Sequence, residues 1–304
     1  MKRRNFVQHA GLAGVLAAGV APAVVHAQAA VRWRLASSFP KSLDNLFGVA
    51  EAAAKQVSEM SGGKFVISTH AAGELVPALG VLDAVQNGTI ECTQTAPYYF
   101  FGKDPTFGLG GAIPFGMNSR QMSAWMLDGN GLKLMREFYA GYNVINFPMG
   151  NTGAQMAGWF RKEIKSLADI KGLKMRIGGF GGTVLARLGA VPQNIPPGEI
   201  YTALEKGTID AAEFIGPYDD ERLGLNKVAP IYHYPGWWKA VRRSICLSTT
   251  RPTRRFPLNT KPFWPRLAAP RTPRCRHAMT PAIRPRSSVS WPVAPSWCAC
   301  PKTS

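Results

Sequence analysis

The sequence predicts an α/β protein of two similar lobes, each built on a mostly parallel sheet covered by helices. The chain opens with a strand, a helix and a second strand, an order typical of an α/β layer. Two segments also resemble each other, LDAVQNGTIE at 82–91 and YTALEKGTID at 201–210. Each is expected to be a helix ended by Gly88 or Gly207 and followed by a short strand. The similarity indicates two related lobes, although so short a motif can also recur by chance.

The first lobe is expected to cover residues 28–150. Residues 31–37 alternate as a half-buried strand, and residues 42–60 form an alanine-rich helix that Gly62-Gly63 ends. Residues 64–69 form the next strand. Because strand, helix and strand alternate, the sheet of this lobe is expected to be mostly parallel.

The second lobe is expected to cover residues 151–238. The expected crossings between the lobes are the glycine-rich residues 107–115 and the segment around Pro148 and Gly150. The elements expected in the second lobe are a strand at 155–161, a short helix at 166–170, a strand at 173–177, a helix at 182–188 and a helix opened by Pro196 and Pro197.

Residues 239–304 differ so much in composition from the rest that we expect them to be an out-of-frame, disordered tail. They hold 14 of the 36 Lys and Arg, 11 of the 24 Pro and four of the five Cys, but no Asp, Glu, Gly, Tyr or Gln. All 31 Gly precede them. Few folded domains have such a composition. The tail is therefore interpreted as the product of a frameshift.

The genetic code is consistent with one missing base after Trp238. Two tryptophans, a glutamate and two glycines can be encoded TGG TGG GAA GGC GGC, and loss of one G from the GGG run gives TGG TGG AAG GCG, which encodes residues 237–240 as they stand. In the other frame, residues 258–265 allow PEYQAVLA and residues 278–294 allow YDARNPAALKRLVAGG, both with helical spacing. Chance agreement through codon degeneracy is the alternative. A raw DNA read without a missing base would exclude the frameshift.

Residues 1–27 are expected to be an export signal peptide. Three basic residues at 2–4 precede a small-residue apolar run at 11–25, and Val25-His26-Ala27 offers a cleavage site. The pair Arg3-Arg4, followed by Phe6, favours the twin-arginine route to the periplasm. An uncleaved anchor is the alternative, but the apolar run is short for a membrane span.

The net charge of +18 would ordinarily indicate nucleic acid or an anionic membrane as partner. Without the leader and the tail, however, the chain holds 19 basic and 18 acidic residues. The tail combines basic residues with Trp264, Trp291 and Trp297, a pattern of single-strand binding, but no nucleic-acid-binding motif accompanies it. No nucleic-acid partner is expected. Only Cys92 lies in 28–238, so no disulfide framework is encoded there.

The residues with the clearest chemistry lie around a glycine cluster at 178–182, between an expected strand and an expected helix. A phosphate-binding loop would lie in such a place, but the spacing does not match the dinucleotide fingerprint, and a turn of close backbone approach is favoured. Arg176 precedes the cluster and could hold a carboxylate through two parallel hydrogen bonds, with a surface arginine as the alternative. Glu213 ends the matching strand, which suits a cation held between the two groups. His70 and His233 lie in no recognisable catalytic or zinc motif.

Six ordered segments carry a resemblance to a known family: Tyr98–Pro105 (YYFFGKDP), Gly150–Met156 (GNTGAQM), Gly172–Gly179 (GLKMRIGG), Asp210–Glu213 (DAAE), Gly216–Asp220 (GPYDD) and Tyr234–Trp238 (YPGWW). Over residues 30–238 the chain resembles the solute-binding proteins of tripartite ATP-independent periplasmic (TRAP) transporters, in the branch that binds 2-oxo acids. The resemblance implies a type II-like protein whose two lobes close by a hinge over a small carboxylate such as pyruvate. It implies TRAP membrane subunits as partners, and a homodimer is a further expectation.

The resemblance also implies the residues that bind the carboxylate. Arg176 is expected to clamp it, Tyr98 and Tyr99 to line the pocket from the first lobe, and Gln155 to contact it.

The resemblance further implies that a metal cation, sodium or calcium, binds with the carboxylate, and no organic cofactor is expected. Gln155, Glu213 and the backbone carbonyl of Phe214, where the family usually has tryptophan, are the implied metal ligands. The chain departs from the family at Lys239, where the family has a glutamate that completes the metal site and where the reconstructed frame restores one. As it stands, the chain places a cation there and should bind a metal poorly.

The tail also replaces a segment that, in this family, returns to the first lobe and supplies a strand and long helices. Because an uncovered sheet promotes aggregation, we expect the chain to fold partially at best, which puts its function in doubt. A cooperative, ligand-stabilised thermal transition would contradict this.

Two other functions are alternatives to transport. The first is an exported enzyme with Glu213 as base and Arg176 as clamp, which recovery of the ligand unchanged would exclude. The second is a sensor or scavenger with the same fold, which neighbouring genes for two membrane subunits would exclude.

Overall fold

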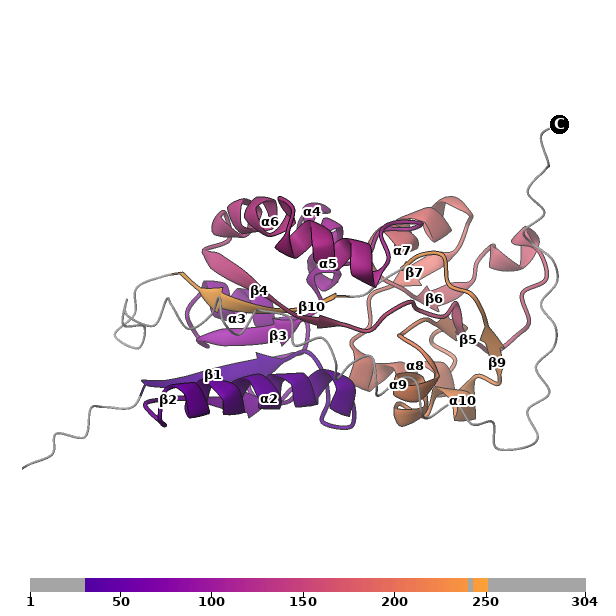
Figure 1. Cartoon of the computed structure of the whole chain (residues 1–304). Helices are drawn as coiled ribbons and strands as arrows, with labels where there is room; N and C mark the ends of the chain where they lie inside the picture. Colours follow the sequence, from indigo (N-terminus) through magenta and orange to yellow (C-terminus); the bar gives the residue numbers. More distant parts are fainter. Residues whose placement is uncertain (1–30, 240–242, 251–304) are drawn as a thin grey trace, which may run out of the picture. The chain divides into compact units, whose positions relative to one another are not determined.

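The structure, a computed structural model, describes residues 31–239 and 243–250 (Figure 1). The expected signal peptide and the tail beyond residue 250 lie outside the described residues. Within the described part, the strands form two five-stranded sheets. The predicted α/β class is confirmed, and the two expected lobes correspond to these two sheets.

The first sheet has the order β2-β1-β3-β10-β4. The strands β1, β2 and β3 are parallel, whereas β10 is antiparallel to both of its neighbours. Their bounds are β1 Val31–Ser37, β2 Phe65–His70, β3 Cys92–Thr95, β4 Val144–Asn151 and β10 Arg243–Thr249.

The second sheet has the order β7-β6-β8-β5-β9, with β6, β7 and β8 parallel and β5 antiparallel to both neighbours. Its strands are short: β5 Gly158–Phe160, β6 Lys174–Arg176, β7 Val191–Gln193, β8 Ala211–Ala212 and β9 Ile231–His233. Each sheet therefore combines three parallel strands in the same relative order with an inserted antiparallel strand and an edge strand.

Helices cover the sheets, as Figure 1 shows for α2 along β1 and β2 and for α6 beside β4. The first half contains α2 (Asp44–Met60), α3 (Val81–Gln86), η1 (Pro97–Phe100), α4 (Thr106–Leu109), α5 (Ser119–Leu127) and α6 (Gly131–Ala140). The second half contains η2 (Leu167–Ile170), α7 (Gly179–Arg187), η3 (Pro197–Glu199), α8 (Ile200–Glu205), α9 (Pro217–Arg222) and α10 (Leu225–Val228).

Helix α2 has the features that the sequence predicts. It buries Leu46, Phe47, Ala50, Ala54 and Val57, which recur at helical spacing on one face. Its Ala50, Ala54 and Val57 pack with strand residues of the first sheet in one core cluster. The two glycines at 62 and 63 adopt φ values of 58° and 77°, a conformation that ends a helix at low cost only for glycine.

The internal repeat corresponds to equivalent parts of the two sheets. Gly88 follows α3 with φ 74°, and Gly207 follows α8 with φ 69°. The acidic residues that end the two motifs make the same contact: Glu91 Oε2 accepts from the backbone N of Arg34 in β1 at 2.8 Å, and Asp210 Oδ2 accepts from the backbone N of Lys174 in β6 at 3.0 Å. The two segments are therefore similar in structure as well as in sequence.

Residues 243–249 correct the expectation that the chain is disordered from residue 239 onward. They form β10 between β3 and β4, with Ile245 and Leu247 1% and 0% exposed in the main core. The physical reason is that a strand inserted between two others is held mainly by backbone hydrogen bonds, and these bonds form with almost any side chains. A short stretch with apolar residues at alternate positions meets the remaining requirement.

One expected crossing is also wrong. Residues 107–115 begin in α4, and the chain then continues through α5 and α6 into β4 of the first sheet. Phe107 is buried in the core against Phe138 and Tyr139. The second expected crossing is close to the observed one, because β4 ends at Asn151 and the next strand belongs to the second sheet.

Candidate functional site

The six expected site residues lie at the end of a strand or in the segment that follows one. Arg176 is the last residue of β6, and Glu213 and Phe214 follow β8. The tyrosines 98 and 99 lie in η1, directly after β3. Because the carboxyl ends of parallel strands are where α/β sheets bind ligands, this placement suits a binding site.

Arg176 is 1% exposed and forms a buried ion pair with Glu213, which is 0% exposed. Its Nη1 donates to Glu213 Oε1 at 2.8 Å and to the Glu213 carbonyl oxygen at 2.6 Å, while its Nε donates to the Ile195 carbonyl at 3.0 Å. The guanidinium also lies 5.6 Å from the ring centre of Phe214. Burial opposes the charge, but Glu213 and the two neighbouring tyrosines raise the pKa of Arg176 above its ordinary value.

Lys239 joins this pair from the far end of the second half of the chain. Its side chain is 1% exposed, and its Nζ donates to Glu213 Oε1 at 2.6 Å. The ammonium also lies 4.2 Å from the ring centre of Tyr98, a cation–π distance. One carboxylate oxygen of Glu213 therefore accepts from two cations.

Gln155, in the segment between β4 and β5, lies beside Lys239. Its backbone N donates to the Lys239 carbonyl at 3.3 Å, and its own carbonyl accepts from the N of Gly236 at 3.3 Å. The Gln155 residue is 2% exposed. The backbone thus fixes a buried amide next to the charged pair.

Several polar atoms of this cluster lack a hydrogen-bond partner within the described part of the chain. They are the Gln155 Oε1 and Nε2, the Arg176 Nη2 and the Glu213 Oε2. Leaving a buried polar atom unsatisfied costs about 1–3 kcal/mol. These atoms are available to hydrogen-bond with a polar ligand.

The aromatic side of the cluster fits against the glycine cluster. Tyr98 and Tyr99 are 0% and 4% exposed, and their rings meet edge to face at 4.9 Å. A Cβ on Gly178 or Gly179 would lie 3.3 Å from Tyr98. This close approach between segments of the two sheets is the role that the sequence favoured for the glycines.

The loop after Phe214 is held by a buried carboxylate. Asp220 Oδ1 accepts from the backbone N of Ile215 and of Gly216, and its Oδ2 accepts from the indole of Trp159. Burial raises the pKa of Asp220 to about 7, although these donors oppose the rise. The loop that carries Glu213 and Phe214 is therefore held by Asp220 at Ile215 and Gly216 and by Arg176 at the Glu213 carbonyl.

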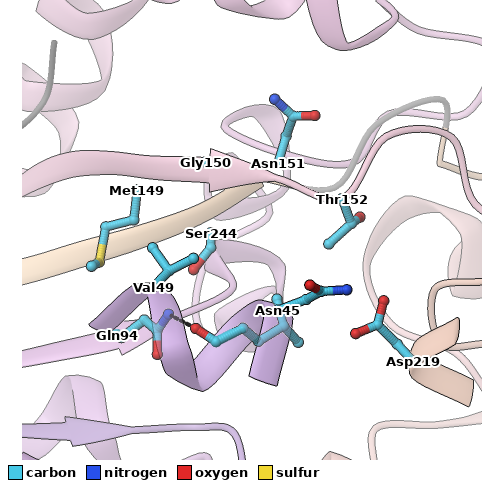
Figure 2. Close-up of a pocket in the computed structure, with 10 residues that line it drawn as sticks. Asn45, Val49, Gln94, Met149, Gly150, Asn151, Thr152, Asp219 and Ser244 are labelled. Carbon is cyan, nitrogen blue, oxygen red and sulfur yellow. Dashed lines mark hydrogen bonds between the residues drawn. The ribbon is translucent and has the colours of Figure 1, made fainter. Parts of the chain in front are cut away.

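A small pocket, partly open to solvent, lies elsewhere, between α2, β3, β4, β10 and α9 (Figure 2). It is lined by polar side chains that include Asn45, Asn151, Thr152 and Asp219. None of the six expected residues lines it. We place the candidate site at the Arg176 cluster, because buried charges and unsatisfied polar atoms converge there.

The side chains at the cluster do not fit a metal ion as the chain stands. The described residues contain no group of three or more His, Cys, Asp and Glu side chains that could hold one. Gln155 Oε1 and Glu213 Oε2 are suitable oxygen atoms, but the Lys239 ammonium lies against the other oxygen of Glu213. Two positive charges ~4 Å apart repel by about 4 kcal/mol at the effective dielectric of a protein.

Two equivalent sheets with a buried, charged cluster at strand ends define a two-lobed ligand-binding protein. Residues 36–242 match the family DctP, bacterial extracellular solute-binding protein, family 7. The chain belongs to this family. The family match ends at residue 242, just beyond the predicted breakpoint at Trp238.

Relatives with a stated ligand support this assignment. The monocarboxylate 2-oxoacid-binding periplasmic protein of Nostoc sp. is 54% identical over 245 residues, which cover 79% of this chain and 67% of that protein. A TRAP transporter solute-binding protein from Bordetella bronchiseptica, with calcium and picolinate bound, is 45% identical, with a TM-score of 0.73 over 82% of this chain and 77% of that one. One from Pseudoalteromonas atlantica, with sodium and pyruvate bound, is 41% identical, with a TM-score of 0.75 over 79% and 72%.

Within the described residues, no helix combines the length and apolar composition needed to cross a bilayer.

Sequence reasoning missed some contacts of the cluster. The Ile195 carbonyl accepts from Arg176, and the Asn194 side chain donates to the Tyr99 carbonyl at 3.1 Å. A backbone acceptor has no signature in a sequence. The available signal was position, because both residues directly follow the parallel strand β7.

Proposed function

We propose that this chain is the periplasmic solute-binding subunit of a TRAP transporter and binds a small 2-oxo monocarboxylate such as pyruvate. The observation that carries this proposal is the buried Arg176, whose Nη2 has no hydrogen-bond partner among the described residues. A carboxylate oxygen is the natural acceptor for such a group. The ligands bound by the Bordetella and Pseudoalteromonas proteins, picolinate and pyruvate, are both carboxylates.

The proposed roles of the side chains follow from this assignment. Arg176 clamps the carboxylate, Gln155 donates its amide to the ligand, and Tyr98 and Tyr99 form the apolar wall. Glu213 orients the guanidinium through its ion pair. We further propose export by the twin-arginine route, delivery of the ligand to two TRAP membrane subunits, and a homodimer, the last supported by the dimer of the Bordetella protein.

Calorimetric titration of the chain with pyruvate and longer 2-oxo acids tests this proposal. We expect saturable binding with the ligand recovered unchanged, which also separates transport from the alternative of an exported enzyme. Arg176→Lys should weaken binding about tenfold or more, because an ammonium cannot keep the bonds to Glu213 and Ile195 and at the same time donate to the ligand as Nη2 would. Arg187→Lys, on the exposed face of α7, is the matched control. Equal affinity of the Arg176→Lys variant and the unchanged chain would contradict the assignment.

A further inference from the structure

We propose that the Lys239 ammonium takes the place of a metal ion in ligand binding, so that this chain binds its 2-oxo monocarboxylate without a metal. The inference rests on the function proposed above and concerns the same site. The neighbouring structures that hold picolinate and pyruvate also hold calcium and sodium. A bound cation is therefore compatible with this type of site, and the question is which cation this chain uses.

Both the side chain and the backbone of Lys239 are held by contacts. Its ammonium contacts Glu213 at 2.6 Å and lies over the ring of Tyr98 at 4.2 Å. Its carbonyl accepts from the backbone N of Gln155. A lysine side chain that is 1% exposed and held in this way is part of the site rather than a solvated surface group.

The local charge favours an anionic ligand. Arg176, Lys239 and Glu213 are joined by ion pairs of 2.8 and 2.6 Å, and these three side chains together carry one net positive charge. The buried Asp220 also interacts electrostatically with Glu213 and with the buried Asp219, and burial favours its neutral form. A buried excess charge is costly unless it is paired. A monocarboxylate supplies one negative charge and would leave the group neutral, without any further cation.

The hydrogen-bonding groups also suit a 2-oxo acid. Such a ligand presents a carboxylate and a neighbouring keto oxygen, which are acceptors. The Arg176 Nη2 and the Gln155 Nε2 are buried donors that lack a partner within the described chain. An ammonium carries three donor hydrogens and can serve several acceptors at once, as a metal ion does for oxygen atoms.

The test measures how pyruvate binding by the whole chain depends on metal. The chain is dialysed against EDTA in a sodium-free buffer and titrated with pyruvate, and the titration is repeated with excess CaCl₂ and with excess NaCl. We expect binding in EDTA, with a Kd that either salt changes less than about threefold. Binding that requires calcium or sodium would overturn the inference and leave the proposed function intact. Absence of binding in all three buffers would overturn both.

Variants at position 239 sharpen the result. Lys239→Met keeps the apolar stem and removes the charge, and we expect it to weaken metal-free binding about tenfold to a hundredfold. Lys239→Arg keeps a cation and should retain metal-free binding. Lys227→Met, at an exposed position on α10, is the matched control and should bind as the unchanged chain does. Metal-free binding that survives Lys239→Met would refute the role of the ammonium.

Circular dichroism of each variant verifies its fold. If the Lys239 variants fail to fold, the metal dependence of the unchanged chain still decides the question by itself.

Discussion

The two sheets share one strand order, yet only one of their two inserted antiparallel strands has a sequence that matches the family. The strand β5 of the second sheet lies within the family match, whereas β10 of the first sheet lies beyond it. Both strands fill the gap between a parallel strand and an edge strand. The position between a parallel strand and an edge strand therefore requires backbone hydrogen bonds and a few apolar side chains rather than a particular sequence.

The two sheets also differ in the chemistry at their strand ends. The first contributes aromatic rings, Tyr98 and Tyr99, while the second contributes charges, Arg176 and Glu213. The polar specificity of the site is therefore concentrated in the second half. Lys239, from the junction to the first sheet, adds a cation to that half.

Strand β10 should contribute strongly to the stability of the first sheet, and a core substitution in it should have a large effect. Leu247 is 0% exposed, so Leu247→Ala should destabilise the first sheet by about 2–5 kcal/mol through lost burial and a residual cavity. Hydrogen exchange of the amides in β3 and β4 measures this local stability. Leu134→Ala, at a position that is 51% exposed, is the control and should change it by less than about 0.5 kcal/mol. Unchanged protection in Leu247→Ala would mean that β10 contributes nothing to the first sheet.

Much of the fold could be predicted from the sequence, because short sequence patterns specify the same helices and turns that the packing of the whole chain requires. The apolar spacing of α2 and the left-handed glycines Gly88 and Gly207 each specify structure within a few residues. The strand β10 could not be predicted, since its surroundings of Arg, Pro and Cys indicate no folded domain. Its environment is set by β3 and β4, which are distant in sequence.

The candidate site was predictable in part for a related reason. Arg176 and Glu213 have side chains whose chemistry is visible in a sequence and whose positions follow expected strands. The ion pair between Glu213 and Lys239 joins residues on separate segments, and its geometry exists only in the fold. The Ile195 carbonyl, an acceptor for Arg176, has no side-chain signature at all.

A moderate loss of stability is expected from substitutions of Glu91 and Asp210, the acidic residues that end the two repeated motifs and accept from the backbone of β1 and β6. Glu91 is 6% exposed and also accepts from the Arg34 side chain at 3.1 and 2.9 Å, whereas Asp210 is only partly buried. Glu91→Gln should therefore cost about 1.5–3 kcal/mol, because it removes charge-assisted hydrogen bonds. Asp210→Asn should cost about 0.5–1.5 kcal/mol.

Urea denaturation of the two variants, followed by far-ultraviolet circular dichroism, measures this difference. The paired design controls itself, since both substitutions remove one negative charge and keep the shape of the side chain. A larger loss from Asp210→Asn than from Glu91→Gln would show that burial does not set the strength of this contact in the two sheets.

The smallest expected effect concerns the contact that joins the two halves at the surface. Asp44 Oδ2, on α2, accepts from Tyr218 Oη at 2.9 Å and pairs with Arg222 Nη2 at 3.1 Å on α9. The side chains of Arg222 and Asp44 are 39% and 52% exposed, so water screens the pair and it should contribute about 0–1 kcal/mol. A double-mutant cycle with Asp44→Asn and Arg222→Gln measures the coupling. A coupling energy above about 2 kcal/mol would contradict the expectation that water screens this pair.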